Sequence, residues 1–485
     1  MSLTWSIKVN WSGDGSTMVE EASRAIGMHV KRGRDEYLRV DGDGNAIGYE
    51  RVQPGTCSVV MLNTDGRFDP YNTSSPLYPY ILPGRKAVVT VTDNSTATTY
   101  PVIVGRLVIP RPTSGDLSTC TLEIVDALDL LEKQDIQYAV TAGSNLKDLI
   151  VLVCNMAGIP WHVTDVATDK LAYWWADRKA AQEIADLVDS SLGWFFMSAS
   201  DYATFYDRYH VFTSLATITQ DRIGKEILLP QPWDAVRNRV VVVAHPLTLG
   251  PDGSELWRLS DTPTIGAGET KTYLATYAYS SFPAAAYPVI TPVGETDVTV
   301  NTAANGSGTD LTGSCTIGLT DYGSQGLLAI TNGSASPGVI TLAKIRGTPL
   351  YSPSSVAVQK DNTASQSLYQ VRQLTIDSRW QENAYKAEDQ ANWLKNFLGN
   401  PLAFPQITVE SRPGVQFAPD LFAQVPLSLS QLGISGNYLV SSIEHQWLSE
   451  NGQAVLTKFG MEPAPDLSGY WRFTTQIGVT SKFAM

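Results

Sequence analysis

The chain runs Cys57-Ser58-Val59-Val60-Met61-Leu62 between two short segments that favour turns, Pro54-Gly55 before it and Asp65-Gly66 after it. Side chains of a β-strand alternate between its two faces, so the odd-numbered residues of this run share one face. Pro-Gly and Asp-Gly pairs are typical of turns. We therefore predict a strand over residues 57–62 with a turn on either side.

Similar strands surround this one over residues 1–138. Another turn is predicted at Pro83-Gly84, and Ala87, Val89 and Val91 alternate with their neighbours after it. Val102–Ile109 and Cys120–Ile124 have the composition of two more strands. Several short strands separated by turns predict a barrel or sandwich, and we assign residues 1–138 to a first β-barrel domain.

Residues 139–225 change to a small α+β domain. Ser144 is a candidate N-cap, and a second helix is predicted to begin near Asp177 and to end at Gly193. A hairpin is predicted from the aromatic arms Trp194–Phe196 and Thr204–Tyr206. The first helix is predicted to bury a stripe at helical spacing, formed by Leu146, Leu149, Ile150, Val153 and Cys154.

The rest of the chain returns to strands, and the predicted fold class is mainly β with α+β. We assign 226–261 and 366–465 to a second β-barrel region, opened by the strand Val236–Ala244 and containing an Ala-rich helix over 381–398. A hairpin is predicted from Ile443–Trp447 and Ala454–Phe459. The helix is predicted to bury Ala384, Ala387, Ala391, Leu394 and Leu398.

Two segments differ from these domains. Residues 262–365 are rich in Gly, Ser, Thr and Asn, and no Lys or Arg occurs between Lys271 and Lys344, so we predict an inserted β-rich domain. Residues 466–485 form an apolar tail that includes Trp471 and Phe483. We expect this tail to dock onto another domain or chain.

Composition limits the function. The 485 residues carry a net charge of −13, which disfavours sequence-driven nucleic-acid binding but not the passage of DNA beside an acidic wall. Four scattered cysteines predict neither a disulfide scaffold nor a zinc site of the usual spacing. The N-terminus lacks the apolar core of a signal peptide, and no stretch approaches the ~20 residues of a membrane-spanning helix.

Motifs for catalysis are missing, so we predict no enzyme, no catalytic residue, no cofactor and no metal. Gly-x-Ser-x-Gly and His-Glu-x-x-His are absent, and the five histidines have no ligand spacing. Asp41–Asn45 begins like a calcium loop, but Ala46 and Val52 stand where the motif needs glycine and glutamate, which favours a solvated turn. Glu382, Glu388 and Asp389 are expected on the exposed face of the third helix.

Aromatic residues leave a binding function open. Tyr173-Trp174-Trp175 could stack on sugars, but beside an amphipathic helix it is more often core or interface. The better candidates for carbohydrate contact lie in the insertion. They are Tyr277, Tyr279, Phe282 and Tyr287.

The order of several motifs resembles the hub proteins of bacteriophage tail tips and baseplates. The first domain carries Leu62-Asn63-Thr64-Asp65-Gly66-Arg67-Phe68-Asp69-Pro70, Ile81-Leu82-Pro83-Gly84-Arg85, Gly105-Arg106-Leu107 and Asp126-Ala127-Leu128-Asp129-Leu130-Leu131. Later segments similar to the family are Gly193-Trp194-Phe195-Phe196, Val236-Arg237-Asn238-Arg239-Val240, Val440-Ser441-Ser442-Ile443-Glu444-His445 and Thr457-Lys458-Phe459. The resemblance covers most of the chain outside 262–365.

The resemblance implies a structural protein made in the host bacterial cytoplasm and located at the virion tail tip. Three copies of two barrels would give six positions around a channel for genome ejection. The implied partners are two further copies in a homotrimer, the distal tail-tube ring, the tape measure protein, and tip fibres or receptor-binding proteins. DNA would pass without sequence-specific binding. Two alternatives remain: a receptor- or carbohydrate-binding tail protein acting through 262–365 in host attachment, and a cell-wall hydrolase.

Overall fold

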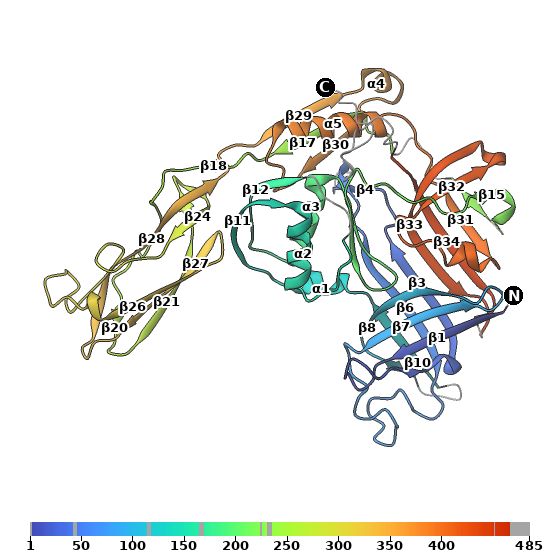
Figure 1. Cartoon of the computed structure of the whole chain (residues 1–485), viewed down its shortest axis with the longest axis horizontal. Coiled ribbons are helices and arrows are strands. Elements are labelled where there is room, and N and C mark those ends of the chain that lie inside the picture. Colours follow the sequence, from blue (N-terminus) through green and yellow to red (C-terminus); the bar gives the residue numbers. More distant parts are fainter. Residues whose placement is uncertain are drawn as a thin grey trace, which may run out of the picture.

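The computed structural model describes residues 2–41, 46–113, 118–163, 169–223, 226–229, 235–450 and 452–465. The protein is mainly β, as predicted. Two strand-rich modules lie side by side, a helical unit lies beside them, and an elongated arm extends away from the rest (Figure 1). Within the described ranges no helix has the length and apolar character needed to cross a membrane.

The first β-module contains the predicted N-terminal strands in the order β3-β6-β10-β8-β7-β1-β2. Cys57, Val59 and Met61 point into its core, and so do Ala87, Val89 and Val91. Its elements are β1 (Leu3–Val9), β2 (Val19–Glu20), η1 (Ala22–Arg24), β3 (Ala25–Gly33), β6 (Gln53–Leu62), β7 (Lys86–Asp93), β8 (Thr98–Leu107), β9 (Arg111–Pro112) and β10 (Thr119–Val125).

Of the predicted turns, Asp65-Gly66 and Pro83-Gly84 are confirmed, and both glycines have positive φ. The turn at Pro54-Gly55 is wrong, because both residues lie inside β6. Gly55 is needed there for a close approach. A Cβ on it would lie 2.6 Å from Asp126 Oδ2, to which its N–H donates a hydrogen bond.

The α+β unit buries all five predicted residues of its first long helix, α2. Ser144 does not cap it, since β11 continues to Asn145 and that residue takes the N-cap position. The hairpin of aromatic strands is confirmed. The elements are α1 (Leu128–Lys133), β11 (Tyr138–Asn145), α2 (Leu146–Met156), β12 (Lys170–Ala176), α3 (Ala180–Ser191), β13 (Trp194–Met197) and β14 (Ala203–Tyr206).

The second β-module is built around β33, the long strand of the confirmed C-terminal hairpin. The first half of β33 pairs with β32, and its second half pairs with β3. On its other edge β33 pairs with β34, with an irregularity between Val440 and Ser442. The elements are β15 (Ile218–Thr219), η2 (Gln220–Arg222), β16 (Ile227–Leu228), β31 (Gln406–Glu410), α6 (Pro413–Gln416), β32 (Gln424–Leu429), η5 (Ser430–Leu432), β33 (Ile434–Trp447) and β34 (Val455–Pro463).

A separate five-stranded sheet, in the order β29-β17-β30-β5-β4, packs against the Ala-rich helix α5. The strand expected to open the second barrel, β17, belongs to this sheet instead. Val240, Val242 and Ala244 are fully buried in the same core as Ala387 and Ala391 of α5. The elements are β4 (Leu38–Val40), β5 (Ala46–Tyr49), β17 (Arg239–Ala244), β29 (Val356–Asp361), α4 (Thr363–Tyr369), β30 (Gln373–Asp377) and α5 (Ala384–Leu398).

The arm is organised by β28, whose 14 residues pair with five other strands. Two of them, β18 and β19, precede residue 262, whereas β29 inside the predicted insertion pairs with β17. The domain boundaries themselves stay predictions. The elements are β18 (Thr248–Leu249), β19 (Ser254–Arg258), β20 (Thr264–Ile265), β21 (Thr270–Thr276), β22 (Ala278–Tyr279), β23 (Phe282–Pro283), β24 (Ala285–Ile290), β25 (Val298–Asn301), η4 (Thr312–Ser314), β26 (Cys315–Asp321), β27 (Gln325–Asn332) and β28 (Gly338–Tyr351).

Two predictions concern residues outside the described ranges. These are the apolar tail 466–485 and most of the calcium-like segment, residues 42–45.

Candidate functional site: the junction between the two β-modules

Strand β3 joins the two β-modules edge to edge. It pairs with β6 on one side and with β33 on the other, where the register runs from His29 opposite Gln446 to Gly33 opposite Ser442. One continuous sheet of 14 strands therefore spans both modules. At the end of the ladder Gly33 has φ +103°, and a Cβ there would lie 2.2 Å from the Ser441 carbonyl oxygen.

A buried ion pair lies immediately after this ladder. Arg34 donates from Nη2 to Glu462 Oε2 at 2.6 Å and from Nη1 to the Glu50 carbonyl oxygen at 2.8 Å, and both charged side chains are at least 95% buried. Its guanidinium also lies 5.4 Å from the Phe422 ring centre. Burial disfavours the charge of Arg34, but Glu462 beside it outweighs that effect and raises the Arg34 pKa.

Arg32, two residues earlier, makes the second cross-link. It reaches Asp420 Oδ1 at 2.8 Å and the Met197 carbonyl oxygen at 2.8 Å. Asp420 in turn accepts the Ala199 N–H at 2.9 Å. Arg32 of β3 and Arg34, which directly follows that strand, therefore both bind acids of the second module, and Asp420 also holds the turn between β13 and β14.

Asp126 links the first module to the α+β unit. Its carboxylate accepts the N–H of Gly55 in β6 at 2.8 Å and the N–H of Leu128 in α1 at 3.0 Å. Burial raises the pKa of Asp126 to about 7, against the opposing effect of those hydrogen bonds and of Arg32. The first module, the second module and the α+β unit therefore meet around β3 and β6.

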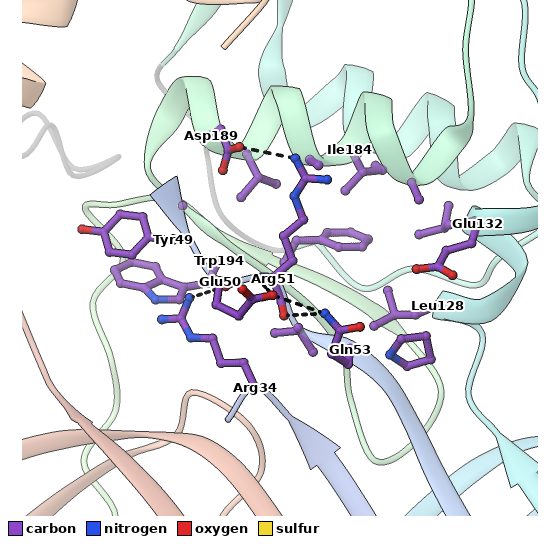
Figure 2. A pocket seen from close by; sticks show the side chains of 18 of the residues that line it. Arg34, Tyr49, Glu50, Arg51, Gln53, Leu128, Glu132, Ile184, Asp189 and Trp194 are labelled. Carbon is purple, nitrogen blue, oxygen red and sulfur yellow. Dashed lines mark hydrogen bonds and ion pairs between the residues drawn. The ribbon is translucent and has the colours of Figure 1, made fainter. Parts of the chain in front are cut away.

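A cavity of about 140 Å³ remains where these units meet (Figure 2). Leu128, Ile184 and Trp194 line its apolar part. At its polar end Asp189 lies 3.6 Å from Arg51 and 3.7 Å from Arg39. Burial raises the pKa of Asp189, and the two arginines act in the opposite direction. These groups neutralise one another, which suits a structural joint better than a reaction centre.

The four predicted carbohydrate contacts do not form one cluster. Tyr277 is 1% exposed in the arm core, and its hydroxyl lies 3.3 Å from Asp321 Oδ1. Tyr279 and Phe282 flank Tyr351, with ring centres 5.4 and 5.9 Å away. Tyr287 instead lies 6.2 Å from Tyr173 of the α+β unit. Carbohydrate contact therefore stays a prediction, and its geometry favours Tyr279 and Phe282.

The other residues considered for sugar or acid chemistry have structural partners. Trp174 and Trp175 are buried in the core of the α+β unit. Glu382 is not on an exposed helix face, because it precedes α5 and accepts the N–H groups of Ala172 at 2.9 Å and Tyr173 at 3.4 Å. Glu388 pairs with Lys360, and Asp389 pairs with Arg208.

Three histidines also have defined partners. His29 lies 3.0 Å from Glu444, and His245 lies 2.6 Å from Asp377. His445 is buried and lies 2.9 Å from Thr457 Oγ1, and burial together with Arg32 lowers its pKa to about 3. In the part of the chain that the structure describes, no group of three or more His, Cys, Asp or Glu side chains could hold a metal ion.

Sequence reasoning missed the junction arginines and acids. Arg32 continues the alternation of the buried residues Met28 and Val30 in β3, and Arg34 continues it just past the end of the strand. Charged residues in such an apolar alternation are a signal of buried pairing. Asp126 belongs to the sequence motif Asp126-Ala127-Leu128-Asp129-Leu130-Leu131. Its closeness to Gly55 could not be deduced from spacing along the chain.

This arrangement of paired β-modules, an α+β unit and a second sheet has the fold of known tail proteins. The 43 kDa tail protein of prophage MuSo2 from Shewanella oneidensis matches with a TM-score of 0.52 and 11% identity, over 96% of this chain and 99% of that chain. The tail protein from Neisseria meningitidis MC58 matches with a TM-score of 0.50 and 9% identity, over 96% and 97% of the two chains. Neither a protein-family model nor a curated protein matches the sequence.

Proposed function

We propose that the chain is a structural hub at the distal end of a phage tail, in the virion. It would join the hexameric tail tube to threefold tip components and form part of the channel for DNA ejection. The observation that carries this proposal is the β3–β33 junction, which places two β-modules of one chain edge to edge in a continuous sheet. Such a rigid double module can occupy two neighbouring positions of a ring.

A homotrimer follows from this use of the two modules. Three double modules give six positions, which match a sixfold tube on one side and threefold components on the other. The partners in this proposal are two further copies of the chain, the distal tail-tube ring, the tape measure protein, and tip fibres or receptor-binding proteins. The net charge of −13 would repel passing DNA instead of binding it.

The mass of the protein in solution tests the trimer. We expect light scattering at micromolar concentration to give three chains per particle, or a multiple of three, alone or after addition of the tail-tube protein. Electron microscopy of these particles should show six similar lobes around a bore. A particle that stays a single chain in both conditions would contradict the hub.

The hub acts without catalysis in this proposal. Zymography on host cell wall should show no clearing, and Glu444→Gln should behave like the unchanged protein. Clearing that this substitution abolishes would instead support the hydrolase alternative.

The arm supports a second candidate function, carbohydrate binding during host attachment. Phe282 is 40% exposed and lies with Tyr279 beside Tyr351, and exposed aromatic side chains of this kind stack on sugars. A glycan array with the full chain tests this candidate. Binding that Phe282→Ala abolishes and Tyr71→Ala preserves would favour it, because Tyr71 is an exposed aromatic of the first module. The absence of binding to any glycan on the array would favour the structural hub without a carbohydrate-binding role.

A further inference from the structure

The arm presents an open strand edge. Strands β21, β27 and β26 form a three-stranded sheet, and within the described residues β26 pairs with β27 alone. It has seven residues, whereas the strands that end the long sheet of the body, β2 and β16, have two each. Short terminal strands are one way in which proteins prevent edge-to-edge pairing, and β26 lacks that protection.

The hydrogen bonds show which backbone groups of β26 face outward. Gly333 N–H donates to the Ser314 carbonyl at 3.0 Å, and Tyr322 N–H donates to the Gln325 carbonyl at 2.8 Å. These bonds lie at the two ends of the ladder, so the even-numbered residues between them bond to β27. The N–H and C=O groups of Ile317 and Leu319 therefore point away from the sheet.

The side chains of β26 also suit an additional strand. Ile317 and Leu319 are half-buried at the margin of the arm core, while Thr316, Gly318 and Thr320 are exposed on the other face. Before Asp321 the strand carries no charge. A further strand would cover the two apolar residues without burying an ionised group.

We propose that β26 pairs antiparallel with β26 of a second copy of this chain, about a twofold axis at Gly318. In this register Ile317 lies opposite Leu319 of the second copy, and Thr316 lies opposite Thr320. Apolar side chains meet apolar ones on one face, and hydroxyls meet hydroxyls on the other. The outward backbone groups of Ile317 and Leu319 form the hydrogen-bonded pairs, so the strand is complementary to itself.

The central position supports the same register. A Cβ on Gly318 would meet nothing within 4 Å, so the face of the sheet is open where the two strands would meet. Asp321 falls opposite Cys315 of the second copy, which keeps the two carboxylates at opposite ends of the ladder. The pairing makes a six-stranded sheet from two arms, and it is independent of the hub role because it links arms and not β-modules.

A disulfide across the twofold axis tests the register. Facing Gly318 residues form a non-hydrogen-bonded pair with Cα atoms about 4.5 Å apart, which a disulfide can bridge. In a Cys315→Ser background, Gly318→Cys should give a covalent dimer on non-reducing gels after mild oxidation of the full chain at micromolar concentration. The yield should be at least fivefold above that of Thr316→Cys or Thr320→Cys alone, whereas a mixture of those two should also cross-link.

Leu319→Lys in the Gly318→Cys background is the matched control. The substitution should block strand pairing, because an inward-pointing charge on an edge strand opposes it. It should abolish the covalent dimer while circular dichroism stays unchanged. Equal cross-linking of all three single-cysteine variants would overturn the proposal, since it would indicate random collision. The absence of a cross-link with Gly318→Cys would also overturn the proposal. The edge of β26 would then be available for pairing with a strand of another protein. A twofold contact cannot close inside a threefold ring, so it would join separate trimers. Leu319→Lys should therefore leave particles of three chains, and loss of the trimer itself is a separate outcome.

Discussion

At the residue scale, burial decides which charges the protein can tolerate. His445 sits inside the protein with a pKa of about 3, so it stays neutral at pH values where an unfolded histidine is protonated. Arg34 is just as buried but keeps its charge because Glu462 neutralises it. His445 lies in β33 and Arg34 directly follows β3, so both belong to the junction of the two β-modules.

We predict that His445 makes folding sensitive to acid. The pKa of His445 is lower in the folded than in the unfolded protein. Its contribution to the free energy of unfolding is therefore fully present above the unfolded pKa of about 6.5 and is lost as the pH falls toward 3. The loss at pH 5 should be on the order of 2 kcal/mol. His445→Gln should flatten the dependence of unfolding free energy on pH between 6.5 and 5, as measured by urea titration. The exposed His162→Gln should leave the slope unchanged.

Breaking the buried ion pair should be costly. Arg34→Met leaves Glu462 buried without its partner, and we expect a loss of about 3–5 kcal/mol in the free energy of unfolding. The double variant Arg34→Met with Glu462→Leu should recover most of that loss. Lys31→Met removes the exposed Lys31–Asp35 pair of the same region and should cost less than about 1 kcal/mol. Equal losses for the two single variants would contradict the structural role of Arg34.

Residue patterns predicted burial well and pairing poorly. Cys57, Val59 and Met61 were placed correctly, because alternation depends only on neighbours along the chain. The partner of Arg34 is 428 residues away, and no local pattern identifies it.

At the element scale, amphipathic helices are predictable and the neighbours of strands are not. The stripe of α2 follows from helical spacing and is confirmed, and so is that of α5 apart from Ala384, which is only partly buried in the first turn. The apolar alternation of β17 correctly indicates a buried strand, but it contains no information about which sheet buries it. The junction between β3 and β33 was missed for the same reason.

The junction gives a prediction at this scale. Gly33→Ala should weaken the pairing of β3 with β33, because the alanine would need a positive φ and its Cβ would collide with Ser441. We expect a lower melting temperature and a free-energy loss above about 1 kcal/mol. Gly27→Ala lies in the same strand with its nearest contact at 3.7 Å and should have little effect. Similar melting temperatures for the two variants would show that the junction tolerates a Cβ.

At the scale of the whole molecule, the protein combines a rigid body with a projecting arm (Figure 1). Trp175 packs beside Gly323 at the base of the arm, and Ser324 Oγ donates to Asp177 Oδ2 at 2.8 Å. The predicted insertion therefore has its own core and a defined contact with the α+β unit. Composition indicated the separate core, and only the structure shows the contact with the α+β unit.

Proteolysis distinguishes a compact arm from a loose one. Trypsin has no site between residues 272 and 343, so complete digestion of the unfolded chain should release 272–344 as one peptide in mass spectrometry. Elastase has many sites there, yet the native arm should resist it because Leu328, Ile330 and Ile340 are fully buried. Rapid elastase cleavage within 272–343 of the native protein would contradict a compact arm.

The placement of β3 also affects how the protein is made. One edge of this strand stays uncovered until β33 has left the ribosome, about 400 residues later, which at 5–20 residues per second is on the order of tens of seconds. During that interval the nascent chain presents a strand edge that could pair with a neighbouring polypeptide. Arg32 and Arg34 at its end lack their partners Asp420 and Glu462 during that interval, and charged residues at an open strand edge disfavour pairing with identical nascent chains.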